Sequence, residues 1–439
     1  MTPPLRGSDV TAGARPGPVP GAETAPERPG PGPGPGAPEP AAFEVNVAFI
    51  AMMAAMIAIN AFAADMVIPG LGVISDHFQL TDPNHRQWVI YASFLGMAVS
   101  QLLIGPLSDA LGRRPAAFAG LAIFGLGCLL AGAAQDYETL LAARVLQGLG
   151  SGGLRVLAYA ILRDRVAGDE MARSTSLISV GFLILIFIAP MAGQLVIALS
   201  GWRGLFVWLL IQSALTALWL ARALPETLPP ERRRPLAIRP MVKAMRVVAS
   251  TPATLACAGA LAATLGSLAT YIATAEQIFN GIYGLGALMP LAFGILAFAE
   301  GGAAIFNSRA VKRIGALRMA RRGLIGWLFG GGIAAAVFGL GFDGVPPLWL
   351  FMLWNAGALA MFALLFGNLN AVAMAPMGDM AGSASSVLAF MSTAGGALLA
   401  AGAGAAFDGT VVPLAASFGV SGAVGLAALT YAQRRGAFA

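Results

Sequence analysis

Long apolar segments are the feature that most limits what this chain can fold into. From Val45 onward, runs of about 20 mostly apolar residues recur, separated by short polar connections. In the hydrocarbon core of a bilayer, a helix of that length satisfies its backbone hydrogen bonds within itself. Only 11% of the 439 residues are charged, compared with about 25% in a soluble protein. We therefore predict an all-α polytopic membrane protein.

Twelve apolar runs can be distinguished, and one polar connection divides them. Residues 1–42 are rich in Pro and Gly, contain almost no large apolar residue, and are predicted to form a disordered tail. The polar segment 224–252 separates six runs within 43–223 from six runs within 253–439. The predicted transmembrane helices span 46–70, 87–107, 115–134, 138–162, 174–199, 203–223, 253–276, 285–307, 322–341, 347–372, 381–405 and 410–432.

The positions of the arginines predict the orientation. If every run spans the bilayer, Arg113, Arg163 and the arginines of 224–252 fall on one side. The opposite side carries essentially Arg86 and Arg203. Because positively charged connections remain in the cytoplasm, both termini are expected there. The net charge of +6 follows from this bias and does not indicate nucleic-acid binding.

The connection after the second run, GPLSDALGRRP at 105–115, concentrates charges at the membrane surface. Asp109 and Arg113 lie four residues apart, so they would share a face of a helical turn. A similar basic segment, NSRAVKRIGALRMARR at 307–322, follows the eighth run, so the two halves echo each other. Two parallel six-helix repeats with a basic linker are typical of a large class of secondary transporters.

Several motifs resemble those of one transporter family. GPLSDALGRRP resembles the signature loop of the major facilitator superfamily. RVLQGLGSGG (144–153) is similar to the arginine motif of its proton-coupled members, and APMAGQLV (189–196) to the antiporter motif of its exporters. LPETL (224–228) and TAEQIFNGIYGLG (274–286) resemble the bicyclomycin/chloramphenicol-resistance (Bcr/CflA) type of drug/proton antiporter. The resemblance covers about 43–435 and implies two pseudo-symmetric six-helix bundles.

The resemblance also implies roles for two groups of residues. In the signature loop, Asp109 is expected to face a neighbouring helix N-terminus and Arg113 to pair with an acid, as a latch between inward and outward states. The antiporter motif implies a bend and a close helix approach, although Ala189 and Gln194 replace two of its usual glycines. The cytoplasmic gate motif comprises Gly105, Asp109, Gly112, Arg113 and Arg114, and the antiporter motif comprises Gly181, Pro190 and Gly193.

Four ionisable residues within the apolar runs are candidates for proton coupling, because a charge in lipid is costly. By resemblance, Arg144 couples proton and substrate movement, and Asp65 matches an acidic position of the drug exporters. The alternative for Asp65 is a backbone cap where Pro69 interrupts the helix. Glu276 is the pseudo-symmetric counterpart of Asp65 or lies at the periplasmic interface. Glu300 is a second proton site or the partner of an arginine.

A polar stripe on the fourth run predicts a cavity. Arg144, Gln147 and Ser151 recur at the helical period, and a polar stripe on an apolar helix should face a water-filled space. Arg155 either continues this stripe or extends to the cytoplasmic surface. The predicted substrate cavity is lined by Asn60, Gln147, Ser151, Arg155, Tyr271 and Phe279.

Other activities are disfavoured by what the sequence lacks. No GxxxxGK[ST] segment is present for ATP. His77 and His85 are the only histidines, and Cys128 and Cys257 lie isolated in apolar runs, so neither a metal site nor a disulfide is expected. Without a catalytic constellation, we do not expect an enzyme, and the proton gradient takes the place of a cofactor.

The predicted function is proton-coupled export of small lipophilic or amphipathic compounds by alternating access, in the inner membrane of a bacterium. The expected partners are the substrate, protons and lipid, and the protein is expected to be a monomer. The alternatives are an exporter or importer of a specific metabolite, such as an amino acid or sugar, and a non-transporting membrane receptor. The antiporter motif argues against import.

Overall fold

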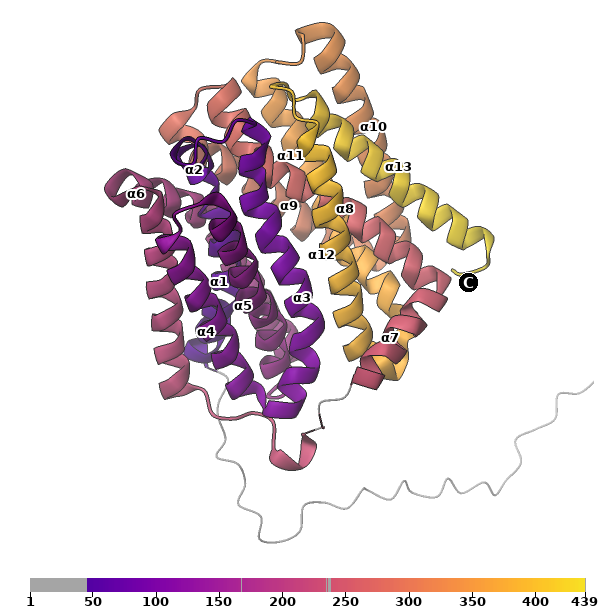
Figure 1. Cartoon of the computed structure of the whole chain (residues 1–439). Helices are drawn as coiled ribbons and strands as arrows, with labels where there is room; N and C mark the ends of the chain where they lie inside the picture. Colours follow the sequence, from indigo (N-terminus) through magenta and orange to yellow (C-terminus); the bar gives the residue numbers. More distant parts are fainter. Residues whose placement is uncertain (1–45, 167, 234, 236–237, 439) are drawn as a thin grey trace, which may run out of the picture. The chain divides into compact units, whose positions relative to one another are not determined.

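The computed structural model describes residues 46–166, 168–233, 235 and 238–438 (Figure 1). Every regular element within these residues is a helix, which confirms the predicted all-α fold. The predicted tail at 1–42 lies outside the described residues.

The helices follow the predicted apolar runs, with short helical turns at several of their ends. The α-helices are α1 (Val47–Asp65), α2 (Leu71–His77), α3 (Trp88–Leu111), α4 (Arg113–Ala133), α5 (Tyr137–Arg163), α6 (Gly168–Ala223), α7 (Ile238–Ser250), α8 (Pro252–Glu276), α9 (Met289–Ile314), α10 (Ala316–Phe342), α11 (Leu348–Met374), α12 (Ala381–Ala405) and α13 (Val412–Arg434). The 3₁₀ turns are Ile68–Gly70, Pro83–Gln87, Pro230–Arg232, Gly286–Leu288 and Ala375–Met380, and a π-helix covers Gln277–Ile282.

Eleven helical segments in the described part of the chain are long and apolar enough to cross a membrane, whereas the sequence predicts twelve. The difference lies in α6, which contains both predicted spans 174–199 and 203–223. A straight helix of its 56 residues would be about 84 Å long, nearly three times a bilayer core. Gly201 interrupts it with φ 71° and ψ −176°, a conformation that glycine adopts without strain. The break divides α6 into a first arm (168–200) and a second arm (202–223).

The two echoing connections share one backbone device. Gly112 joins α3 to α4 with φ 104°, and Gly315 joins α9 to α10 with φ 89°. Both glycines have nearly the same extended ψ, 161° and 148°. Each one ends a helix and directly precedes the next helix. The repeat predicted from the sequence is therefore present in the backbone at these two turns.

Helices α1–α6 pack mainly among themselves, as do α8–α13, and α3 with α12 and α6 with α9 join the two groups (Figure 1). Small residues allow close packing inside each group. A Cβ on Gly96 of α3 would lie 2.0 Å from the Val145 carbonyl oxygen of α5. A Cβ on Gly148 of α5 would lie 2.0 Å from the Ser93 carbonyl oxygen. The glycine-rich segment 148–153 is therefore a packing surface.

The central connection contains the amphipathic helix α7. Ala244 and Val248 of α7 are buried against Met377, Ala384 and Val387 at the ends of α11 and α12. The helix ends joined by Gly112, by Gly315 and by the connection containing α7 are called the basic side below, and Figure 1 shows α7 at the bottom. The side that carries α2 is called the opposite side.

Candidate functional site

Two carboxylates from different helix groups lie near each other within the helix bundle. Asp65 is the last residue of α1, and Glu300 lies near the middle of α9. They are close enough for their charges to repel each other. In the described residues, neither carboxylate has a hydrogen bond or a cationic partner, so nothing supports a capping role for Asp65 or an arginine partner for Glu300.

Two buried polar side chains of the C-terminal helices lie beside this pair. Tyr271 of α8 is 4% exposed, and Asn355 of α11 is fully buried. The Tyr271 hydroxyl lies close to the Asn355 amide and within electrostatic range of Asp65 and Glu300. Its approach to Asn355 does not reach full hydrogen-bond geometry, and both side chains lack a well-formed partner among the described residues. Unsatisfied buried groups of this kind need an explanation, such as a bound molecule.

Arg144 is completely buried, and its described hydrogen-bond partners are two backbone carbonyls and an amide oxygen. Its Nε donates to the Val89 carbonyl at 2.9 Å, its Nη2 to the Ala63 carbonyl at 2.8 Å, and its Nη1 to Gln147 Oε1 at 2.6 Å. Ala63 precedes Asp65 by two residues on α1. Arg144 therefore ties the end of α1 that carries Asp65 to α3 and α5.

The polar stripe of α5 does not face a water-filled space, as the sequence had led us to expect. Gln147 and Ser151 are completely buried, and Gln147 donates to Cys128 Sγ of α4 at 3.2 Å. Neighbouring helices rather than water supply the partners of these polar groups. The glycines between the polar residues allow α3 and α4 to pack closely against α5. Arg155 is partly exposed at the far end of the stripe.

The other predicted cavity residues divide between two environments. Asn60 is partly buried on α1, and Tyr271 belongs to the polar group described above. Phe279, by contrast, is completely buried, with its ring centroid 5.5 Å from that of Phe293 and 5.8 Å from that of Phe351. Phe279 is a core aromatic residue that packs the π-helix after α8 against α9 and α11, not a cavity wall.

Glu276 takes part in a polar network on the opposite side. Glu276 Oε2 accepts a hydrogen bond from Arg86 Nη1 at 2.7 Å, which makes an ion pair between the two helix groups. Of the two possibilities left open for Glu276, this contact favours the interface.

Amides extend the same network. Gln87 Nε2 donates to Gln277 Oε1 at 2.8 Å, and Gln277 Nε2 donates to Asn84 Oδ1 at 3.0 Å. The Asn84 amide donates to the Phe407 carbonyl at 2.8 Å, after the end of α12. We call Asn84, Arg86, Gln87, Glu276 and Gln277 the inter-group network. The sequence did not predict a contact for Arg86, Gln87 or Gln277, because their partners lie about 190 positions away.

The signature loop forms ion pairs within the N-terminal part of the chain. Arg113 Nη1 lies 2.5 Å from Asp109 Oδ1, and Nε lies 3.0 Å from Asp164 Oδ2. Asp109 and Arg113 do not share a helical turn as expected, because α3 ends before Gly112 and Arg113 begins α4, so their ion pair crosses the turn. Ser108 Oγ accepts a further hydrogen bond from Arg113. The expected pairing of Arg113 with an acid is thus present, and Asp164 is a second acid that the motif did not reveal.

The carboxylate that binds the N-terminus of α4 is Glu226, from the connection after α6, and not Asp109 of the signature loop. Glu226 accepts hydrogen bonds from the backbone N–H groups of Arg113 and Arg114, at 2.9 and 3.2 Å, at the start of α4. A carboxylate is favourable there because the first N–H groups of a helix have no partner within it. A Cβ on Gly112 would lie 2.5 Å from Glu226 Oε2, so this turn has space only for glycine. The Arg114 side chain donates to the Ala221 carbonyl at 2.8 Å.

A pocket of about 580 Å³ lies on the basic side between the two helix groups. Asp109, Arg113 and Arg163 line it from the N-terminal group, and Ser383 and Ser386 line it from α12. Gly105 of the signature loop lies at the same seam, since a Cβ there would be 3.3 Å from Ser386 Oγ. The two helix groups are therefore separated by a pocket on the basic side, whereas hydrogen bonds and an ion pair join them on the opposite side.

The antiporter motif behaves differently at its three positions. A Cβ on Gly193 would lie 2.1 Å from the Met66 carbonyl oxygen, so the expected close approach is made to the end of α1 beside Asp65. Pro190 is buried, and the first arm of α6 continues through it to the break at Gly201. No described atom lies within 4 Å of a Cβ on Gly181, so this glycine does not mediate the expected close packing.

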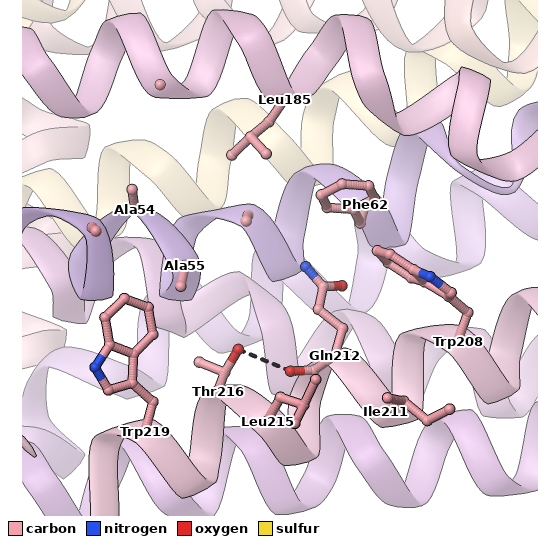
Figure 2. A pocket seen from close by; sticks show the side chains of 13 residues that line it. Ala54, Ala55, Phe62, Leu185, Trp208, Ile211, Gln212, Leu215, Thr216 and Trp219 are labelled. Carbon is pink, nitrogen blue, oxygen red and sulfur yellow. Dashed lines mark hydrogen bonds between the residues drawn. The ribbon is translucent and has the colours of Figure 1, made fainter. Parts of the chain in front are cut away.

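Gly181 instead lines a groove of about 520 Å³ between α1 and both arms of α6 (Figure 2). We call it the α1–α6 groove. Its walls include Ala54, Ala55, Phe62, Trp208, Gln212 and Trp219.

Comparison with known proteins agrees with this architecture. The family description of the Major Facilitator Superfamily matches residues 53–401. Multidrug resistance protein D of Escherichia coli is 32% identical over 189 residues, which are 43% of this chain and 48% of that protein, so this match spans about half of the relative. The bicyclomycin resistance protein homolog of Haemophilus influenzae is 25% identical over 80% of this chain and 87% of its own length.

Among solved structures, the partially occluded inward-open conformation of the xylose transporter XylE from E. coli has the same fold. It superposes with a TM-score of 0.64 at 15% sequence identity, over 88% of this chain and 97% of XylE. The candidate spans, the glycine turns of the repeat and the match over most of the chain agree. The chain therefore belongs to the Major Facilitator Superfamily, resembles its Bcr/CflA-type drug antiporters, and is a multi-pass membrane protein.

Proposed function

We propose that this transporter is a proton-coupled exporter of small lipophilic or amphipathic compounds. It would work by alternating access in a bacterial inner membrane, as twelve helices in two bundles with both termini in the cytoplasm. The break of α6 at Gly201 supports two crossings by that helix. The basic side would then be cytoplasmic, since its connections carry most of the arginines.

The observation that carries the proposal is the carboxylate pair of Asp65 and Glu300. Two carboxylates that share a space with little water resist being ionised together, so the pair holds a proton or a cation. Because α1 and α9 belong to different helix groups, separating the groups would separate the carboxylates and change how tightly a proton is held. A proton can thus be taken up in one state and released in the other.

Other features support the direction and the substrate class. Gly193 packs against the end of α1, so the antiporter motif contacts the segment that carries Asp65. Arg144 holds the same segment through the Ala63 carbonyl and is proposed to keep Asp65 in place during the cycle. The names of the relatives, a multidrug resistance protein and a bicyclomycin resistance protein homolog, favour export of drug-like compounds.

Uptake by energised everted vesicles tests the proposal. A panel of lipophilic drug-like compounds should accumulate, and a protonophore should abolish the accumulation. Asp65→Asn or Glu300→Gln should lower proton-driven uptake by about tenfold or more, which corresponds to about 1.4 kcal/mol of lost coupling.

The control is Glu231→Gln, which alters an exposed carboxylate of the central connection and should leave uptake unchanged. Exchange of substrate without a proton gradient should persist in Asp65→Asn, which shows that the variant is folded. Normal proton-driven uptake in both carboxylate variants would refute the site. Uptake of a sugar or amino acid alone would favour the metabolite transporter.

A further inference from the structure

The α1–α6 groove has a lining that differs from the rest of the lipid-facing surface (Figure 2). Ala51, Ala54, Ala55 and Ala58 recur at helical spacing along α1 and form a floor of small side chains. Two tryptophans stand on the second arm of α6 opposite this floor, and Figure 2 shows them at the two ends of the groove. The space between them, about 520 Å³, lies within the range of pockets that hold drug-sized molecules.

The groove opens on the outer surface of the helix bundle. Ile211 and Leu215, which belong to its wall, are 52% and 61% exposed. In a membrane protein, apolar side chains with that exposure contact lipid. A lipid-soluble molecule could therefore reach the groove from the bilayer without passing through water.

One polar side chain points into this apolar space. The Gln212 amide projects from the second arm of α6 and ends beside Phe62 (Figure 2), and its Oε1 is enclosed with no hydrogen-bond partner among the described residues. Thr216, one turn later, uses its hydroxyl to donate to the Gln212 backbone carbonyl at 2.9 Å and leaves the side-chain amide free. An unsatisfied amide in an apolar setting costs free energy, and the acyl chain of a lipid cannot supply a hydrogen bond.

The lining also indicates the charge of an occupant. Among the described residues, none that lines the groove is acidic or basic. The Gln212 amide can present either its NH₂ group or, after rotation, its oxygen, so it can serve a ligand acceptor or donor. The ring of Trp208, which lies 4.9 Å from that of Phe62, provides a flat apolar surface at one end. The complementary molecule is neutral, aromatic and equipped with one amide-like group.

We propose that the α1–α6 groove binds a neutral, lipophilic aromatic amide that arrives from the membrane. Phe62 lies three residues before Asp65, so this end of the groove is about one helical turn along α1 from Asp65. The binding site stands on the observations above, and only its role as a holding site for substrate rests on the proposed export function.

Photo-crosslinking in proteoliposomes tests the site with a defined probe. The probe is 4-benzoylbenzamide, a neutral aromatic amide whose benzophenone group attaches to nearby C–H bonds on illumination. Crosslinked peptides should concentrate in 51–62 and 208–219. Gln212→Leu should lower the labelling of these peptides by about tenfold, because one desolvated hydrogen bond is lost. Labelling by benzophenone itself, which lacks the amide, should be weak and equal in both proteins.

A space-filling variant and its match separate binding from partition into lipid. Ala54→Leu fills the floor of the groove and should also reduce labelling, whereas Ala336→Leu, on an exposed face of α10, should not. Labelling spread over the lipid-facing helices and unaffected by either groove variant would overturn the site. A groove that labels as expected in a protein without proton-driven transport would refute the proposed function and leave the site standing.

Discussion

The two ends of the seam between the helix groups are built from similar side chains in different arrangements. On the opposite side, Arg86 and Glu276 pair across the seam, and Gln87 with Gln277 adds an amide contact. On the basic side, Arg113 pairs with Asp109 and Asp164, both of which belong to the N-terminal group. One end therefore joins the two groups, while the other strengthens a single group and borders a pocket of about 580 Å³. An arginine–carboxylate pair opposes the separation of the two helix groups only where its two members belong to different groups.

Removing the charge of Glu276 should have the largest effect on how firmly the opposite side joins the two helix groups. Glu276→Gln leaves Arg86 partly buried without its counter-charge, which should weaken closure of the opposite side by about 2 kcal/mol and raise the open-to-closed ratio about thirtyfold. Distances between spin labels at Thr81→Cys and Asp408→Cys, in a protein with Cys128 and Cys257 replaced by Ala, would report the shift.

The double variant Arg86→Gln with Glu276→Gln sharpens the test, since removing both partners should cost less than removing one. Glu138→Gln, an exposed carboxylate on the same side, is the matched control. A distance distribution that stays the same in Glu276→Gln would mean that the ion pair does not hold the seam.

A methyl group at Gly404 should have a moderate effect. A Cβ there would lie 2.1 Å from both Gln87 Oε1 and the Tyr91 hydroxyl, so both side chains must shift away from α12. Because these are the ends of flexible side chains, Gly404→Ala should cost about 1 kcal/mol of closure, or about fivefold in the same ratio. Gly402→Ala, where no described atom lies within 4 Å, should change nothing. Equal effects of the two substitutions would argue against a tight seam at this end.

Neutralising Asp109 on the basic side should have the smallest effect. Its side chain is 46% exposed, and Arg113 keeps Asp164 and Ser108 as partners, so Asp109→Asn should cost about 0.5 kcal/mol. Transport should slow about twofold with an unchanged range of substrates. Asp164→Asn, which removes the more buried partner, should slow it further. A changed range of substrates in either variant would place the signature loop at the substrate rather than at the state balance.

The sequence predicted most features that depend on neighbours along the chain. The apolar runs determined the helices because a membrane allows few alternatives, and the predicted echo of two loops is present in the similar turns at Gly112 and Gly315. The pairing of Arg113 with an acid was predicted, although it crosses the turn at Gly112 and does not lie on one helical turn. The described residues contain eleven candidate spans and not twelve, because α6 continues past Gly201, the residue with a non-helical backbone conformation.

Features that depend on distant partners were not predictable in the same way. The stripe of Arg144, Gln147 and Ser151 looked like a cavity wall, but helical periodicity cannot tell water from a neighbouring carbonyl as the partner of a polar group. Glu226 was visible only as part of a family-like segment, and nothing in the segment indicated that it caps α4. The positions of Asp65 and Glu300 were predicted, whereas their approach to each other depends on how two helix groups meet.

The inter-group network combines two kinds of force that act over different ranges. The attraction between Arg86 and Glu276 is felt across many ångströms of water and hastens the approach of the two groups, whereas the contacts of Gln87, Gln277 and Asn84 act only after they touch. The speed of closing is then governed by charge, and the lifetime of the closed state mainly by neutral amides. Added salt, which screens charges, would slow the closing step more than it shortens the time spent closed.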